Sequence, residues 1–98
     1  NKQFVFLGFL PLKKKAKTEL CAKPLHQNLT IIFYESTHRL AATILTLREI
    51  IKNKQIVIGR EITKKFEEFM RGDYQTISQQ LEKRKLKGEI VVVIGDPA

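Results

Sequence analysis

The chain has one cysteine, no tryptophan and no apolar run near the ~20 residues that a membrane-spanning helix needs. A lone Cys21 allows no internal disulfide, which favours a cytoplasmic protein. The opening apolar segment 4–10 is too short for a signal peptide and lacks a cleavage pattern. The glycine-rich dinucleotide motif, the P-loop and the Gly-x-Ser-x-Gly context of a nucleophile are all missing. The two histidines, His26 and His38, lack the spacing of a metal site, so we predict no metal.

The composition is that of an ordinary folded domain. Of 98 residues, 43% are hydrophobic and 29% are charged, which suits a single domain over residues 1–98. A chain this short can build a core, but we do not expect a deep ligand cavity without a partner domain. Because the sequence starts at Asn1 and runs directly into an apolar segment, we expect a fragment of a longer protein.

The formal net charge of +8 favours an anionic partner. No segment has the aromatic-flanked amphipathic pattern typical of helices that bind membrane surfaces. Nucleic acid is therefore the favoured charged partner, and we expect no membrane association.

Apolar runs and helical spacings alternate along the chain. Pro24 is expected to end the first helix, Ser36 or Thr37 to cap the second, and Asp73 to cap the third. Leu40, Ile44, Leu47 and Ile51 form the clearest core-facing stripe, and Ala16 with Leu20 form the apolar face of the first helix. The predicted elements are strands at 4–10, 30–35, 56–59, 66–71 and 90–94, and helices at 13–23, 37–52 and 73–87.

The predicted order is β-α-β-α-β-β-α-β. It indicates an α/β fold with a mixed sheet of about five strands and three flanking helices. The strands at 4–10 and 56–59 are continuously apolar, so we expect both to be buried, the latter under cover on both faces.

Residues 34–39 are the first candidate site, because a buried strand ends there in a polar cluster. In a catalytic interpretation, His38 is a general base that Glu35 orients. In a structural interpretation, Ser36 caps the helix, Arg39 pairs with Glu35, and His38 is a surface residue. Spacing alone favours the structural interpretation.

Two further charged segments follow apolar strands. Lys13, Lys14, Lys15 and Lys17 form a run that suits either a solvated face or a phosphate backbone. The second segment begins at Arg60 and extends to Glu68. Adjacent Glu67 and Glu68 point to opposite faces of a strand, so they are poor paired carboxylates.

Four blocks, in order, carry a resemblance to a known family. They are Phe6-Leu7-Gly8-Phe9-Leu10-Pro11 before the lysines, Phe33-Tyr34-Glu35-Ser36-x-His38-Arg39-Leu40, Arg60-Glu61-Ile62-Thr63-Lys64-x-x-Glu67-Glu68-x-x-Arg71-Gly72, and Lys87-Gly88-Glu89-Ile90-Val91. Together they resemble the bacterial 16S rRNA (cytidine 2′-O)-methyltransferase family, a branch of the tetrapyrrole methylase superfamily. The resemblance spans nearly the whole chain.

The resemblance implies a class III S-adenosylmethionine-dependent methyltransferase of two α/β lobes, with the cofactor between them. This chain resembles the C-terminal lobe, without the glycine-rich loop and Gly-Asp segment of the N-terminal lobe. The implied cofactor-binding residues stand at three strand ends: Tyr34, Glu35, Glu61, Ile62, Gly88 and Glu89. Much of the adenine recognition is expected to come from backbone atoms.

The same resemblance implies 16S rRNA, or the small ribosomal subunit, as substrate. The implied RNA-binding residues are Lys13, Lys14, Lys15, His38, Arg39, Arg60, Lys64 and Arg71. The chain departs from the family pattern at Thr37, where proline is usual, and at Leu12, where arginine is usual. No residue is assigned as the catalytic base, and the missing lobe is a possible source of it.

Two other functions stay open at this point. One is a methyltransferase of tetrapyrroles such as corrin or porphyrin precursors, and the other is a non-catalytic basic module for RNA binding or dimerisation. We expect the chain alone to be inactive and to bind cofactor weakly. With the other lobe absent, we also expect an apolar surface near residues 4–9 to be uncovered, and self-association as a homodimer to cover it.

Overall fold

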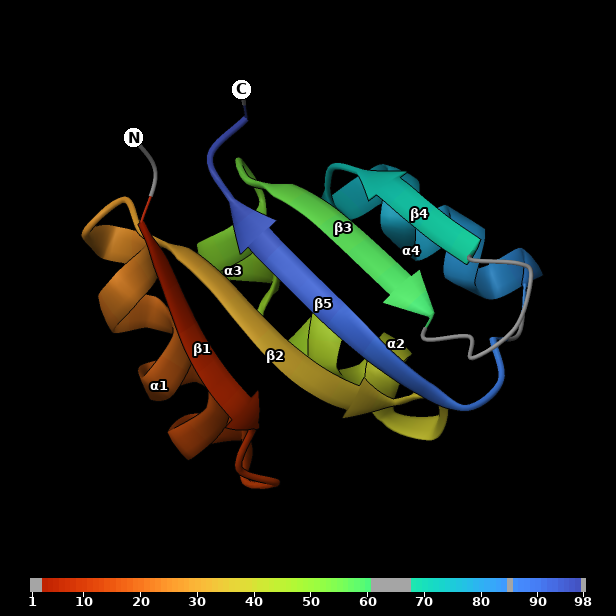
Figure 1. The fold of residues 1–98 in the computed structure, drawn as a ribbon, viewed down its shortest axis with the longest axis horizontal. Coiled ribbons are helices and arrows are strands. Elements are labelled where there is room, and N and C mark those ends of the chain that lie inside the picture. Colours follow the sequence, from red (N-terminus) through yellow and green to blue (C-terminus); the bar gives the residue numbers. More distant parts are fainter. Residues whose placement is uncertain (1–2, 61–67, 85, 98) are drawn as a thin grey trace.

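The computed structural model describes residues 3–60, 68–84 and 86–97, with the backbone alone for Glu68. Nine elements follow in these described ranges (Figure 1). They are β1 (Phe4–Phe9), α1 (Lys14–His26), β2 (Thr30–Ser36), α2 (Thr37–Thr46), α3 (Arg48–Ile51), β3 (Gln55–Arg60), β4 (Glu68–Gly72), α4 (Tyr74–Lys83) and β5 (Glu89–Gly95).

The strands form one five-stranded mixed sheet in the order β1-β2-β5-β3-β4. β1 and β2 are parallel, and β5 runs antiparallel to both of its neighbours, β2 and β3. β4 completes the sheet antiparallel to β3. The predicted α/β class with a mixed sheet of about five strands is confirmed. The last strand of the chain lies at the centre of the sheet, between strands that are distant in sequence.

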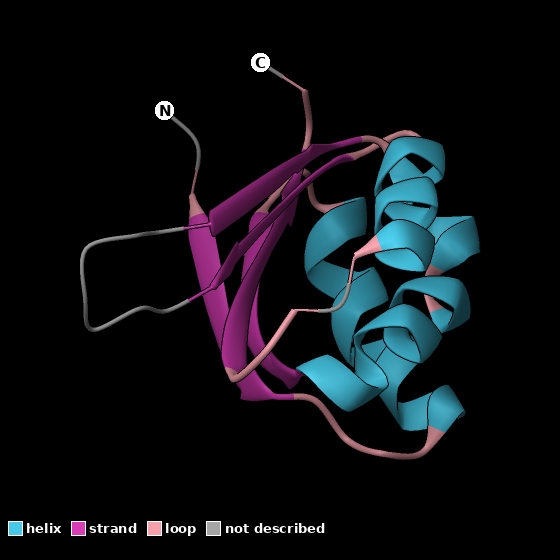
Figure 2. Ribbon diagram, turned by 90° about the vertical axis from the view of Figure 1, so that its right-hand side faces the viewer, coloured by secondary structure: helices cyan, strands magenta, loops and turns pink. Residues whose placement is uncertain are grey.

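All four described helices lie on one face of this sheet (Figure 2). The core fills the space between them, with Phe33 and Ile31 of β2 and Ile58 of β3 no more than 1% exposed. On the opposite face Val57 is only half-buried, so the prediction that this strand is covered on both faces was wrong. The prediction of a buried first strand was also wrong, because β1 is an edge strand with exposed phenylalanines.

Helix α1 differs from its prediction in length and in face. Pro24 lies in its last turn, where the missing N–H costs one hydrogen bond and the ring is buried against the core. The buried face carries Lys17, Cys21 and Leu25, whereas the predicted face residue Leu20 is 38% exposed. After α1, Asn28 adopts a left-handed conformation (φ 62°) and leads into β2.

The predicted second helix is two helices, α2 and α3, because the helix is interrupted at Leu47. The stripe of Leu40, Ile44, Leu47 and Ile51 is buried throughout, as predicted. Thr43, which is not one of the four predicted stripe residues, is also fully buried. The described residues therefore contain four helices where three were predicted.

Helix α4 begins as predicted and ends earlier. The Asp73 side chain caps it by accepting a hydrogen bond from the backbone N–H of Thr76 at 2.8 Å. The helix ends at Lys83, and Arg84 is already extended (φ −127°, ψ 132°). The fourth strand, predicted to end at residue 71, ends at Gly72 as β4, while its predicted start at Phe66 lies outside the described residues.

Candidate functional site

β1, β2 and β3 end, and β5 begins, on the same side of the sheet (Figure 1). We call this side, where the strands end, the strand-end edge. Parallel β1 and β2 both end there, and β5 begins opposite them, with Ser36 paired to Glu89 and Arg60 to Ile90. Free strand ends expose backbone groups and loops, so this edge is the natural place for a ligand in an α/β sheet. The strand-end edge holds the predicted cofactor-binding residues Tyr34 and Glu35 at the end of β2, and Gly88 and Glu89 at the start of β5.

Alternation along β2 sends neighbouring candidate residues to opposite faces. We call the face that carries the described helices the helical face and the opposite one the open face. The half-buried ring of Tyr34 lies on the open face, with its centroid 5.2 Å from that of Phe6 and 5.3 Å from that of Phe9. The side chain of Glu35 points to the helical face and is buried, with a residue exposure of 4%. The two residues cannot present side chains to one ligand on the same face.

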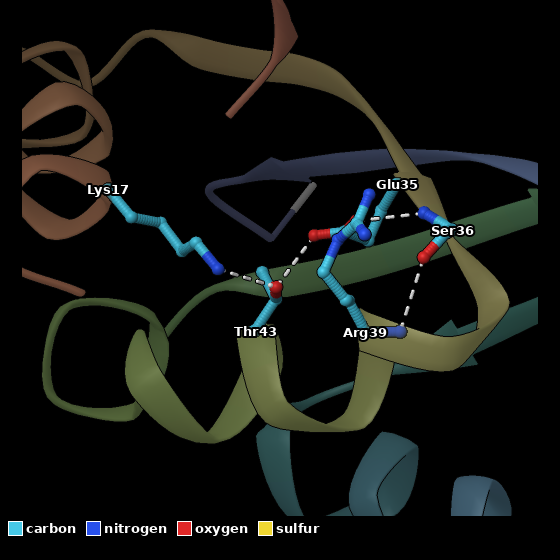
Figure 3. A network of polar contacts seen from close by, with 5 residues as sticks. All are labelled: Lys17, Glu35, Ser36, Arg39 and Thr43. Atoms are coloured by element: carbon cyan, nitrogen blue, oxygen red, sulfur yellow. Dashed lines mark hydrogen bonds and ion pairs between the residues drawn. The ribbon is translucent and has the colours of Figure 1, made fainter. Parts of the chain in front are cut away.

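Both carboxylate oxygens of Glu35 are engaged within the protein (Figure 3). Oε1 accepts from the backbone N–H of Ser36 at 2.8 Å and from Nε of Arg39 at 3.2 Å. Oε2 accepts from the hydroxyl of Thr43 at 2.7 Å, and Nζ of Lys17 donates to the same hydroxyl at 3.1 Å. We call Lys17, Thr43, Glu35 and Arg39 the buried-carboxylate network.

This network holds the turn between β2 and α2. The hydroxyl of Ser36 caps α2 by accepting from the N–H of Arg39 at 3.3 Å, and the carboxylate of Glu35 pairs with the Arg39 side chain. His38 is exposed. The cap by Ser36, the pairing of Arg39 with Glu35 and the surface position of His38 are therefore all confirmed. With its oxygens bonded to Ser36, Arg39 and Thr43, Glu35 is poorly placed to take a proton from a substrate.

The contribution of Lys17 and Thr43 was missed from the sequence. Lys17 is one or two helical turns before Cys21 and Leu25 and therefore shares their buried stripe. Thr43 lies three residues after Leu40 and four before Leu47, which places it on the core stripe of α2. Helical spacing was thus a usable signal, but the polar character of both residues argued against burial.

Cys21 is a core residue in this structure. Its side chain is fully buried, and burial raises the pKa of the thiol to about 12, partly offset by the charge of nearby Lys17. The thiolate is the reactive form of cysteine, so this thiol is inert in the folded protein.

The predicted RNA-binding residues are spread over two regions. Lys13, Lys14 and Lys15 are exposed after β1, and the last two line a groove of about 580 Å³ with Arg48. His38 lines a smaller hollow of about 340 Å³. Arg71 is exposed on β4, paired to Val57, and therefore stands away from the strand-end edge. Arg60 ends β3 at that edge, whereas Glu61, Ile62 and Lys64 lie outside the described residues.

Gly88 and Glu89 form the entry to β5. Gly88 has a left-handed backbone (φ +84°), and a Cβ added to it would meet no heavy atom within 4 Å. The backbone here is therefore open to close approach by a ligand. Glu89 is exposed beside it.

Two negative findings apply to residues 3–60, 68–84 and 86–97. In these ranges no three histidine, cysteine or acidic side chains gather in a group that could hold a metal ion. No helix within them has the length and apolar character to cross a membrane.

Three curated relatives share the name ribosomal RNA small subunit methyltransferase I. The chain is 41% identical over 97 residues to the protein of Buchnera aphidicola subsp. Acyrthosiphon pisum, covering 96% of this chain and 34% of the relative. It is 37% identical to the proteins of Erythrobacter litoralis, over 95 residues, and Bacillus subtilis, over 91 residues. Those matches cover 97% and 93% of this chain, but 34% and 31% of the relatives. The chain thus spans about a third of these relatives. No family model matches it.

Solved structures share the fold at low sequence identity. The methyltransferase CobJ superposes with a TM-score of 0.69 at 14% identity, over 98% of this chain and 42% of that one. Cobalt precorrin-4 methyltransferase CbiF gives a TM-score of 0.68 at 13% identity, over 97% of this chain and 42% of that one. These matches show the fold alone.

Proposed function

We propose that this chain, which is homologous to part of ribosomal RNA small subunit methyltransferase I and has the tetrapyrrole methylase fold, is the C-terminal lobe of a two-lobe methyltransferase. The observation that carries the proposal is similarity over nearly the whole chain to relatives of one description. Since the chain spans about a third of those relatives, the facing lobe comes from residues beyond these 98.

The substrate that we propose is the ribose 2′-hydroxyl of a cytidine in 16S rRNA, in a cytoplasmic small ribosomal subunit. The name of these relatives and the net charge of +8 support RNA as the substrate. Lys13, Lys14 and Lys15 follow the end of β1 in the chain and are exposed, so they can neutralise phosphates. His38 and the half-exposed Arg39 side chain are the proposed positioning contacts on the neighbouring turn.

The proposed cofactor is S-adenosylmethionine, which supplies the methyl group on a positively charged sulfur. The residues at the strand-end edge fit such a group in part. Gly88 leaves its backbone open, Glu89 is exposed, and the Tyr34 ring is half-buried on the open face. The Glu35 side chain does not fit a direct role, so its proposed contact is through the backbone. Glu61 and Ile62 remain proposed cofactor residues outside the described ranges.

The chain's own residues would bind and orient the substrate rather than activate it. The buried-carboxylate network fixes the turn that carries His38 and Arg39, which keeps these side chains in place for an in-line approach of the hydroxyl. Since Glu35 is fully engaged, we assign the proton acceptor to no residue of this chain. This division of roles is why we expect the isolated chain to be inactive.

Two alternatives give different results in one assay. The likeness to CobJ and CbiF is the observation that favours a tetrapyrrole methyltransferase. The basic charge and the exposed phenylalanines of β1 favour a non-catalytic module that binds RNA or forms a homodimer. A homodimer is also compatible with the enzyme, and we retain it as part of the proposal, with its interface away from Phe6 and Phe9.

The test is methyl transfer from radiolabelled S-adenosylmethionine by the full-length protein that carries this chain. We expect label in small ribosomal subunits, no label in uroporphyrinogen, and no turnover by the 98 residues alone. Label only in the porphyrin, or turnover by the isolated chain, contradicts the proposal.

A matched pair of charge variants sharpens this test. Replacing Lys13, Lys14 and Lys15 together by glutamine should weaken RNA binding and reduce its dependence on salt, because fewer counterions are released. The control replaces the exposed Lys23, Lys52 and Lys83, which removes the same charge elsewhere. Equal losses in the two variants would indicate a general charge effect and remove the three lysines from the site.

A further inference from the structure

Three aromatic side chains meet on the open face of the sheet, close to the strand-end edge. Phe6 packs edge-on against Tyr34 (interplanar angle 81°), and Phe9 packs against the same ring at 44°. We call Phe6, Phe9 and Tyr34 the aromatic cluster. Phe6 is 58% exposed and Phe9 is 57% exposed, so the rings contact one another and still present free surface.

A bulge in β1 creates this cluster. Strict alternation would send Phe6 and Phe9 to opposite faces of the sheet, because they are three residues apart. The register shifts between Phe6 and Gly8, so that Phe6 pairs with Ile32 and Phe9 pairs with Tyr34. Gly8 adopts a left-handed conformation (φ 66°) that permits the bulge, and Phe9 therefore joins Phe6 on the open face.

The surroundings of the cluster suit a polyanion that carries flat apolar rings. The exposed Lys13 follows β1, four residues after Phe9. Lys14 and Lys15 come next and line the groove beside α2, which also holds Glu19 and Glu49. At the strand ends themselves, Glu35 is buried on the other face of the sheet, and Glu89 is exposed at the start of β5. Nucleobases of unpaired RNA stack on aromatic side chains while cations bind the phosphates.

We propose that the aromatic cluster is a stacking platform for an unpaired nucleobase of RNA, with Phe9 as the ring that the base contacts. This inference rests on the proposed function and names the part of the substrate that the site recognises. Stacking at this edge would hold one nucleotide, while Lys13, and beyond it Lys14 and Lys15, would bind phosphates further along the same RNA chain. Recognition through a ring face needs no particular base, so it favours unpaired RNA over duplex.

The test compares RNA binding with and without bases. Fluorescence anisotropy measures the affinity of the full-length protein for a cytidine-containing single-stranded oligonucleotide and for an abasic one of equal length and charge. Cofactor is omitted, so binding is read independently of methyl transfer. We expect the intact oligonucleotide to bind the parent on the order of tenfold more tightly. In Phe9→Leu, which keeps an apolar side chain without a ring, this preference should largely disappear.

Two exposed phenylalanines on the same face are matched controls. Phe4 lies at the other end of β1, and Phe69 lies on β4 at the opposite side of the sheet. Phe4→Leu and Phe69→Leu should keep the preference for the intact oligonucleotide. Equal loss in all three variants, or unchanged affinity in Phe9→Leu, overturns the proposal. Light scattering that shows a dimer dissociated by Phe9→Leu, with no preference for bases in the parent, assigns the face to a second copy and also overturns it.

Discussion

The two faces of the sheet use the same kinds of residues for different ends. On the helical face, Phe33 and Ile31 of β2 are fully buried beneath α1 and α2. On the open face, Phe6 and Phe9 of the neighbouring strand are more than half exposed. Phe33, Phe6 and Phe9 are the same residue type, so hydrophobicity alone does not decide which face becomes the core.

The two faces differ in exposure because the described helices cover only one of them. The stripe along α2 and α3 and the buried face of α1 cover one side of the sheet, and no described helix lies on the other (Figure 2). An exposed apolar face of this kind marks an interaction surface more often than a defect. One face therefore carries stability, and the other is available for recognition.

The largest effect should separate the two faces directly. Replacing Phe33 by alanine removes a fully buried ring, and we expect the free energy of unfolding to fall by about 3–5 kcal/mol. Phe6→Ala removes the same ring from the open face and should cost less than about 1 kcal/mol. Urea denaturation followed by circular dichroism measures both values. Similar losses in the two variants would mean that something covers the open face in solution.

A smaller effect should come from the buried-carboxylate network on the helical face. Thr43→Val keeps the shape of the side chain but removes the hydroxyl that joins Lys17 to Glu35. Because both buried charges lose a partner, we expect a loss of about 1–3 kcal/mol. Thr46→Val, one turn later and only half-buried, is the control and should change stability by less than about 0.5 kcal/mol. An equal change in the two variants would show that the buried-carboxylate network does not contribute to the stability of the helical face.

The smallest effect concerns the cap of α4, a helix of the covered face. The hydrogen bond from the Thr76 N–H lowers the pKa of Asp73 below its ordinary value. Its ionised form is thus favoured by folding, so this contribution is complete above the unfolded pKa of ~3.9 and is lost as pH falls through the folded pKa.

Asparagine caps helices about as well as aspartate but does not titrate. The melting temperature of the parent protein should therefore fall more between pH 6 and pH 2.5 than that of Asp73→Asn. Thermal melts at the two pH values measure this difference. Parallel shifts in the two proteins would show that Asp73 does not contribute to the acid sensitivity.

The sequence predicted the fold where pattern and packing agree. The α2 stripe, the caps at Ser36 and Asp73 and the alternation of strands and helices along the chain follow from local spacing. The order of the strands within the sheet was not predicted. The prediction was wrong where tertiary contacts override local preference. Pro24 is tolerated inside α1 because it falls in the last turn and its ring is buried, which no local rule indicates.

The location of the candidate site could be predicted from the sequence, but most of its side-chain contacts could not. Strand ends located the edge, and the pairing of Glu35 with Arg39 followed from their spacing. Lys17 could not be placed there by sequence, since its partner Thr43 is 26 residues away and meets it only through the fold. Phe6 and Phe9 lie on the same face only because β1 has a bulge between them. Simple alternation along the strand would place them on opposite faces.

The central place of β5 has a consequence for how the chain is made. A protein is synthesised from its N-terminus, so β5 emerges from the ribosome after the other four described strands. Before β5 emerges, the native pairs that can form among these strands are β1 with β2 and β3 with β4, and isolated strand pairs have little stability of their own. Closure of the sheet therefore waits for the final strand. A nascent chain, or a truncated one that stops before residue 89, keeps two unjoined halves with their inner edges open to wrong partners.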